Sequence, residues 1–132
     1  WRDALLNYGM PISEKMVVES DTRQKAIIDT PHVLQGENQP DAVFCVNDDC
    51  AAGVLHAAHI LGVDIPNELA VCGFSDAPIC RATKPMLTTV QQHGADIGRR
   101  AMMRLLDRLN GEGKYPRTEM VPTDLIVRET TK

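Results

Sequence analysis

The sequence predicts an α/β fold with a mainly parallel sheet flanked by helices. Apolar, strand-like runs such as residues 42–46 and 69–74 alternate along the chain with helix-like segments. These two runs lack polar alternation, which is typical of strands that are covered on both faces, as in parallel sheets. Regular alternation of strands and helices along a chain favours the same arrangement.

The first third of the chain predicts a helix, a strand and a second helix. Residues 1–8 read as the end of a helix that Gly9 closes. Residues 15–19 are expected to form a short buried strand. Short oxygen-bearing side chains then mark the start of a helix over about 22–34, in which Pro31 is expected to cause a break or a kink.

The alternation continues through the rest of the chain. The strand over 42–46 is followed by a helix that begins after the capping segment 47–49, runs to about Leu61 and ends at Gly62. Its inward face should include Ala51, Ala52, Leu55, Ala58 and Leu61. The later elements are a strand over 69–74, a loop over 75–86, a strand over 87–91, an amphipathic helix over 95–109 and an alternating strand over 119–128.

Length and charge bound what the chain can do. Its 132 residues are enough for one domain with a core, and the net charge is −4. A domain that binds DNA phosphates needs a basic face, and the basic residues here are scattered, so the chain should not bind DNA alone. No apolar run approaches the roughly 20 residues needed to cross a bilayer. We find no secretion signal, and the start at Trp1 favours a piece of something longer.

The four cysteines predict a cytoplasmic protein with reduced thiols. None of Cys45, Cys50, Cys72 and Cys80 forms a C-x-x-C pair, and two of them lie in apolar strand-like runs. His56 and His59 could share a metal ion, but no third ligand is in view. We therefore expect no metal site and no cofactor.

Catalytic motifs give no support to an enzyme. No G-x-G-x-x-G follows a strand, and neither a phosphate-binding Walker loop nor a nucleophile elbow is present. Asp48 and Asp49 at a strand end could indicate a phospho-acceptor domain. That chemistry needs further acidic residues to hold Mg²⁺, and only Asp21 is available. We expect a binding protein.

Three polar segments follow strands of the predicted sheet, at 20–22, 47–49 and 75–76. The carboxyl ends of parallel strands meet at one edge of a sheet, where ligands bind in such folds. This edge is the candidate binding site.

Motifs in order along the chain carry a resemblance to a known family. Residues 40–53, PDAVFCVNDDCAAG, resemble the LacI/GalR pattern PDAIFCANDxxAxG. Residues 61–74 resemble the pattern LGxxVPxDxxVxGFDD up to its Gly-Phe, and residues 85–92 resemble PxLTTVxQ. Residues 123–130 resemble xELIVRxS. The order and spacing hold over nearly the whole chain.

The resemblance implies a Rossmann-like three-layer fold of the periplasmic binding protein-like type. Residues 1–90 and 122–132 would form the C-terminal subdomain. Residues 93–120 would hold hinge crossings with a helix and strand that belong to a missing N-terminal subdomain. A helix-turn-helix headpiece, through which alone the protein would reach DNA, would also be missing.

The implied function is the sensing and dimerisation part of a transcriptional repressor. A small sugar, sugar acid or sugar phosphate would bind between the subdomains and control DNA binding allosterically, and the protein would be a cytoplasmic homodimer with no membrane partner. The alternative is a periplasmic sugar-binding transport receptor of the same fold.

The resemblance also assigns candidate effector-binding residues. Asn47 matches an asparagine that contacts effector hydroxyls, although a plain helix cap is the alternative. Ser75 stands where the family has the first Asp of GFDD, so one hydrogen bond replaces a carboxylate. Thr22 and Asp21 lie near a position that often carries an aromatic residue. Asp48 is included, although a cap or structural hydrogen bond suits it better.

A dimer surface is implied by the helix after Asp49 and by the loop near residues 81–83. Small or aliphatic side chains there would allow close approach of a partner, and the alternative is ordinary packing on the sheet. The assigned residues are Ala51, Val54, Leu55, Ala58, Arg81 and Thr83.

Overall fold

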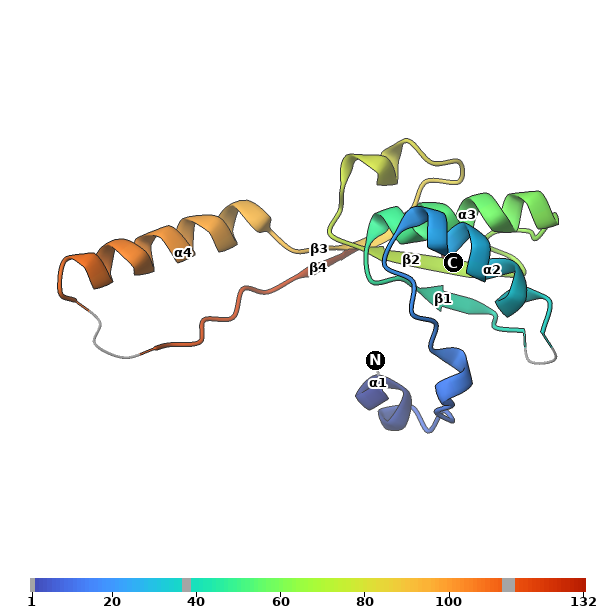
Figure 1. Cartoon of the computed structure of the whole chain (residues 1–132), viewed down its shortest axis with the longest axis horizontal. Helices are drawn as coiled ribbons and strands as arrows, with labels where there is room; N and C mark the ends of the chain where they lie inside the picture. The colour runs from blue at the N-terminus through green and yellow to red at the C-terminus, as the bar shows by residue number, and fades with distance from the viewer. Residues whose placement is uncertain (1, 37–38, 113–115) are drawn as a thin grey trace.

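The computed structural model describes residues 2–36, 39–112 and 116–132. The helices are α1 (Arg2–Asn7), α2 (Arg23–Leu34), α3 (Asp48–Leu61) and α4 (Gly94–Leu109), with short 3-10 helices η1 (Glu14–Met16) and η2 (Pro78–Arg81). The strands are β1 (Ala42–Phe44), β2 (Ala70–Phe74), β3 (Thr88–Gln91) and β4 (Asp124–Ile126). Figure 1 shows a body that holds the sheet and most helices, and an arm that carries α4.

The four strands form one sheet in the order β1-β2-β3-β4. β1, β2 and β3 are parallel, and β4 pairs antiparallel with β3, with Gln91 opposite Asp124. The predicted α/β fold with a mainly parallel sheet flanked by helices is therefore confirmed.

The core lies between the sheet and the pair α2 and α3. α3 packs against β2 and α2 packs against α3, and Val71 and Leu87 are fully buried beneath them. A Cβ atom on Gly53 would lie 2.6 Å from the carbonyl oxygen of Arg23, so the two helices approach closely where glycine leaves room. The inward face predicted for the helix is confirmed at Ala51, Leu55 and Ala58, which are buried.

The other face of the sheet is open within the described residues, which corrects one expectation. Phe44 and Val46 are 59% and 65% exposed, although this run was expected to be covered on both faces. The reason is that α2 and α3 lie on the same side of the sheet. The ring of Phe44 instead meets that of Phe74 edge to face, with centroids 6.3 Å apart.

The strand predicted over 15–19 is wrong. η1 occupies its beginning, and the Ser13 side chain accepts a hydrogen bond from the Lys15 amide at the start of that turn. Val17 and Val18 are both exposed. Among the described strands the sheet ends at β1, so this segment has no ladder partner.

Of the break or kink predicted at Pro31, the break is wrong, because α2 continues to Leu34. Proline cannot donate a backbone hydrogen bond, but its carbonyl still can accept one, here from the Gln35 amide at 3.0 Å. Pro31 still removes the amide that would donate to the carbonyl oxygen of Ile27.

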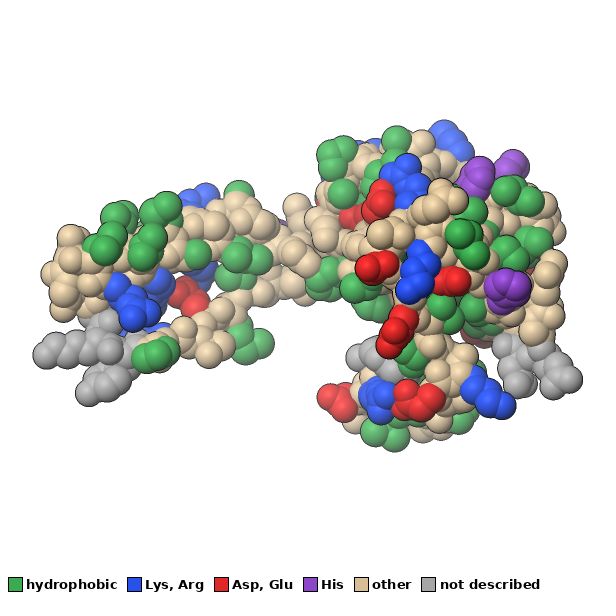
Figure 2. Space-filling model, in the orientation of Figure 1, with side chains coloured by type: hydrophobic (Ala, Val, Ile, Leu, Met, Phe, Trp, Pro, Cys, Tyr) green, Lys and Arg blue, Asp and Glu red, His purple; other side chains and the backbone are tan. Residues whose placement is uncertain are grey.

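The arm lies apart from the core. α4 begins directly after β3, and none of its residues is buried. Its large apolar side chains are all exposed, and apolar side chains are visible along the arm in Figure 2. No helix among the described residues is both long and apolar enough to span a membrane.

Candidate functional site

The polar segments predicted to converge do meet at the carboxyl edge of the sheet. Asn47 caps α3, and its side-chain oxygen accepts a hydrogen bond from the Cys50 amide at 2.8 Å. The Cys50 thiol in turn lies 3.4 Å from the carbonyl oxygen of Ser20. The start of α3 is thus joined to the segment that carries Asp21 and Thr22.

Asp48 joins the start of α3 to the segments that follow β2 and form β3. Its Oδ2 accepts from the Ala77 amide at 2.8 Å, and its Oδ1 accepts from the Thr89 hydroxyl at 2.5 Å. The side chain is buried. A Cβ atom on Gly73 would lie 2.3 Å from Oδ1, so only glycine leaves this carboxylate its place. Both oxygens are engaged inside the protein, which gives Asp48 a structural role.

Thr22 and Asp21 lie exposed at the start of α2. The Thr22 hydroxyl oxygen caps this helix by accepting from the Lys25 amide at 3.3 Å, which leaves its proton available to a ligand. The next residue, Arg23, forms an ion pair with Asp49 of α3. This pair ties the two helix starts together beside the candidate site.

Ser75 lies at the same edge and borders a hollow. Its amide donates to the carbonyl oxygen of Val90 at 2.8 Å, which holds the turn after β2 against β3. The hollow is lined by Ser75, Gln91, His93, Gly94, Ala95 and Asp96. The sequence places Gln91 at the end of a strand and His93 in a hinge crossing, and it names neither as a site residue. Their position at the end of β3, where the chain leaves the sheet, is the signal that could have found them.

His93 connects the two segments that lead to and from the arm. Its Nε2 lies 2.8 Å from Oδ2 of Asp124, the first residue of β4. The backbone of His93 has a φ of +53°, where the chain turns from β3 into α4. The two segments that lead to and from the arm are therefore joined by a side-chain contact at their base.

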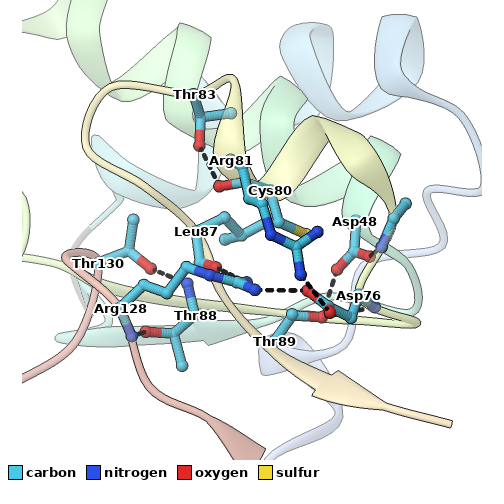
Figure 3. A network of polar contacts seen from close by, with 11 residues as sticks. Asp48, Asp76, Cys80, Arg81, Thr83, Leu87, Thr88, Thr89, Arg128 and Thr130 are labelled. Atoms are coloured by element: carbon cyan, nitrogen blue, oxygen red, sulfur yellow. Dashed lines mark hydrogen bonds and ion pairs between the residues drawn. The ribbon is translucent and has the colours of Figure 1, made fainter. Parts of the chain in front are cut away.

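A network that sequence reasoning missed lies behind Ser75. Figure 3 shows Arg128 and Arg81 reaching the carboxylate of Asp76, beside Asp48 and Thr89. Burial raises the pKa of Asp76, but hydrogen bonds and positive charge from Arg128 and Arg81 outweigh it and hold that pKa below its ordinary value of 3.8. Asp76 is thus ionised at neutral pH.

Most of the residues assigned to a dimer surface are buried within the chain, so the assignment stays a prediction for its exposed and half-buried members. Ala51 and Ala58 have no exposed surface, and Val54 and Leu55 are nearly as buried. They belong to the core between α2, α3 and the sheet, so ordinary packing describes them. Arg81 is exposed, while Thr83 is half-buried with its hydroxyl 3.3 Å from the Cys80 carbonyl oxygen.

The four cysteines are free thiols. Burial raises the pKa of Cys45 to about 12 and that of Cys80 to about 11, so both stay protonated and unreactive at neutral pH. No cluster of three or more potential metal ligands occurs among the described residues.

Comparison with known proteins places this geometry in a family. The model of the periplasmic binding protein-like domain matches residues 2–131. Catabolite control protein A of Priestia megaterium is 32% identical over all of this chain and 40% of its own length. The HTH-type transcriptional repressor PurR of Yersinia pestis is 31% identical over 96% of this chain and 38% of its own length.

A solved structure agrees with these relatives. The complex of the transcriptional regulator CelR with cellobiose superposes with a TM-score of 0.92 at 31% identity, covering 98% of this chain and 40% of that one. The chain thus spans about 40% of the length of these proteins.

The fold and the site define a periplasmic binding protein-like domain, and the chain belongs to that family. Within it, the predicted resemblance to LacI/GalR regulators is confirmed: the chain corresponds to part of the effector-binding domain of a LacI-family transcription regulator. The relatives are transcription regulators, so a transport receptor is not favoured.

Proposed function

We propose that the carboxyl edge of this sheet forms one wall of an effector cleft in a LacI-type repressor. The observation that carries the proposal is the convergence of the segments 20–22, 47–49 and 75–77, which contacts of Cys50 and Asp48 join, beside a hollow bordered by Ser75. Residues 93–120 would lead to a second subdomain that supplies the opposite wall. Effector that favours one arrangement of the walls would control DNA binding through a separate headpiece.

The exposed groups at this edge suit a hydroxyl-rich ligand. The Asn47 oxygen is used by the helix cap, so the amide nitrogen remains to donate to a ligand. The hydroxyls of Thr22 and Ser75 can donate or accept, and Asp21 can accept. A relative carries cellobiose in its structure, which supports a sugar. Because Ser75 lacks the carboxylate of the family pattern, a sugar acid or sugar phosphate would meet less repulsion here.

We further propose that the regulator is a homodimer. With the small residues of α3 buried, a partner would contact the exposed residues beside them, His56, His59 and Ile60, together with Arg81 of η2. The α3 residues of this surface lie toward the end of the helix, and the candidate effector edge lies at its start. A change at one can therefore reach the other through α3.

The experiment separates ligand contact from helix capping at Asn47. Asn47→Asp keeps the oxygen that accepts from the Cys50 amide but removes the amide donor. We expect calorimetric titration of the intact regulator to show at least ten-fold weaker sugar binding, with urea unfolding nearly unchanged. Asn47→Ala, as the control, should lose both binding and about 1 kcal/mol of stability. Unchanged binding in Asn47→Asp would contradict the proposed role.

The charge of the effector is tested at Ser75. Ser75→Asp should weaken binding of gluconate and glucose 6-phosphate and strengthen binding of cellobiose, because the new carboxylate repels anions and accepts from hydroxyls. Tighter binding of the anions to Ser75→Asp would rule out an acidic effector.

A further inference from the structure

The turn after β2 has a backbone that needs support. Ser75 has a φ of +122° and Asp76 a φ of +54°, conformations that residues other than glycine rarely adopt. Such conformations persist where surrounding contacts determine them. Backbone contacts supply part of this support, since the amides of Ser75 and Ala77 donate to Val90 and Asp48.

The carboxylate of Asp76 adds to this support by joining two other segments. Its Oδ1 lies 2.6 Å from Nη2 of Arg128, and its Oδ2 lies 2.9 Å from Nη2 of Arg81. Arg128 lies on the chain just beyond β4, and Arg81 ends η2. The Asp76 side chain therefore links the turn that carries Ser75 to the chain just beyond β4 and to η2, as Figure 3 shows.

The two ion pairs of Asp76 differ in how far they are shielded from water. The Arg128 side chain is 10% exposed and also donates to the Leu87 carbonyl oxygen at 2.8 Å. The chain beyond it is held by Thr130, whose hydroxyl donates to the Val71 carbonyl oxygen and accepts from the Thr88 amide. The Arg81 side chain is 59% exposed, and water competes for such a pair. The Arg128–Asp76 pair is therefore held in place, while the exposed Arg81–Asp76 pair can break.

We propose that Asp76 is a positioning residue that holds Ser75 at the effector edge and couples this edge to both the chain just beyond β4 and η2. The inference deepens the proposed function, on which it rests, by naming how the site communicates. Effector that shifts Ser75 would move the Asp76 carboxylate, and Arg81 would carry that shift into η2, where we place dimer contacts.

Amide hydrogen exchange of the whole 132-residue chain tests the link without any effector, so it can fail independently of the proposed function. Asp76→Asn keeps the shape of the side chain and removes its charge. Relative to amides of β2, we expect exchange at least ten-fold faster in residues 78–83 and also in residues 124–128. Arg81→Ala should speed exchange in residues 78–83 alone and by a smaller factor, because water already competes for this ion pair.

Asp107→Asn is the matched control, because it removes an Asp–Arg contact on the surface of α4. Faster exchange confined to residues 75–77 in Asp76→Asn, or a pattern equal to that of Asp107→Asn, would overturn the proposal. If Asp76→Asn unfolds the chain, Arg128→Lys decides. The proposal requires faster exchange in η2 from that distant substitution, and unchanged exchange there would refute it.

Discussion

Two buried carboxylates, Asp48 and Asp76, organise the effector edge at the scale of single residues. Asp48 is held by a backbone amide, a threonine hydroxyl and its position at the start of α3, where the helix dipole favours negative charge. Asp76 is held by two arginines. Each carboxylate connects segments that are far apart in the sequence. Removal of either one should therefore destabilise segments beyond its own.

Acid should weaken the fold through Asp76. Its native pKa lies below 3.8, so the stability that its ion pairs add is present above that value and is lost as the pH falls through the native pKa. At pH 7 we expect Asp76→Asn to be roughly 3 kcal/mol less stable than wild type, because a buried arginine loses its partner. Urea unfolding should show a smaller difference in the free energy of unfolding between wild type and Asp76→Asn at pH 3 than at pH 7. A constant difference would contradict the assignment.

Sequence predicted some of these residues and not others. The capping oxygen of Asn47 follows from local spacing, and the structure confirms the cap. The network around Asp76 could not be predicted, because Arg128 lies 52 positions away and only the antiparallel return beside β3 brings it close. Val54 was assigned to a dimer surface but is buried in the core, because the motif gives no account of which side of α3 faces α2.

At the scale of elements, the contact of α2 with α3 depends on one missing side chain. A Cβ atom on Gly53 would lie 2.6 Å from the Arg23 carbonyl oxygen and 2.8 Å from Cβ of Ala26, so the helices would have to separate. We expect Gly53→Ala to cost about 1–3 kcal/mol by urea unfolding.

Gly98→Ala provides the comparison for Gly53→Ala. Nothing lies within 4 Å of a Cβ atom there, and alanine favours a helix interior, so stability should be unchanged or raised by up to about 1 kcal/mol. Equal effects of the two substitutions would show that close packing of α2 on α3 is not what Gly53 provides.

Helices and strands are predicted best where the residues that begin and end them are present in the sequence. α3 has a capping residue at its start and Gly62 in the left-handed conformation at its end, and both were read correctly. The segment over 15–19 has the composition of a strand but lacks a neighbour in the described sheet. Apolar composition cannot tell whether a pairing edge is within reach, and for that reason the strand was wrongly expected.

At the scale of the whole molecule, the arm leaves apolar surface uncovered. Ile97, Met102, Leu105 and Leu109 of α4 are among its exposed side chains. Exposed apolar patches of this kind favour association. We expect sedimentation velocity to show the chain self-associating as its concentration rises.

Substitution along the arm checks that expectation. Leu105→Lys together with Leu109→Lys should shift the chain toward the monomer, whereas Ile28→Lys, an exposed site on α2, should leave association through the arm in place. A wild-type chain that stays monomeric at high concentration would contradict the expectation.

The effector edge itself is tested most directly by two-dimensional ¹H–¹⁵N NMR titration of the chain with cellobiose, gluconate and glucose 6-phosphate. The account predicts that at least one of them shifts the signals of Thr22, Asn47, Ser75 and His93 together. Shifts concentrated instead around Leu34, Pro40 and Leu61, which line a second hollow, or no shifts with any of the three, would contradict it.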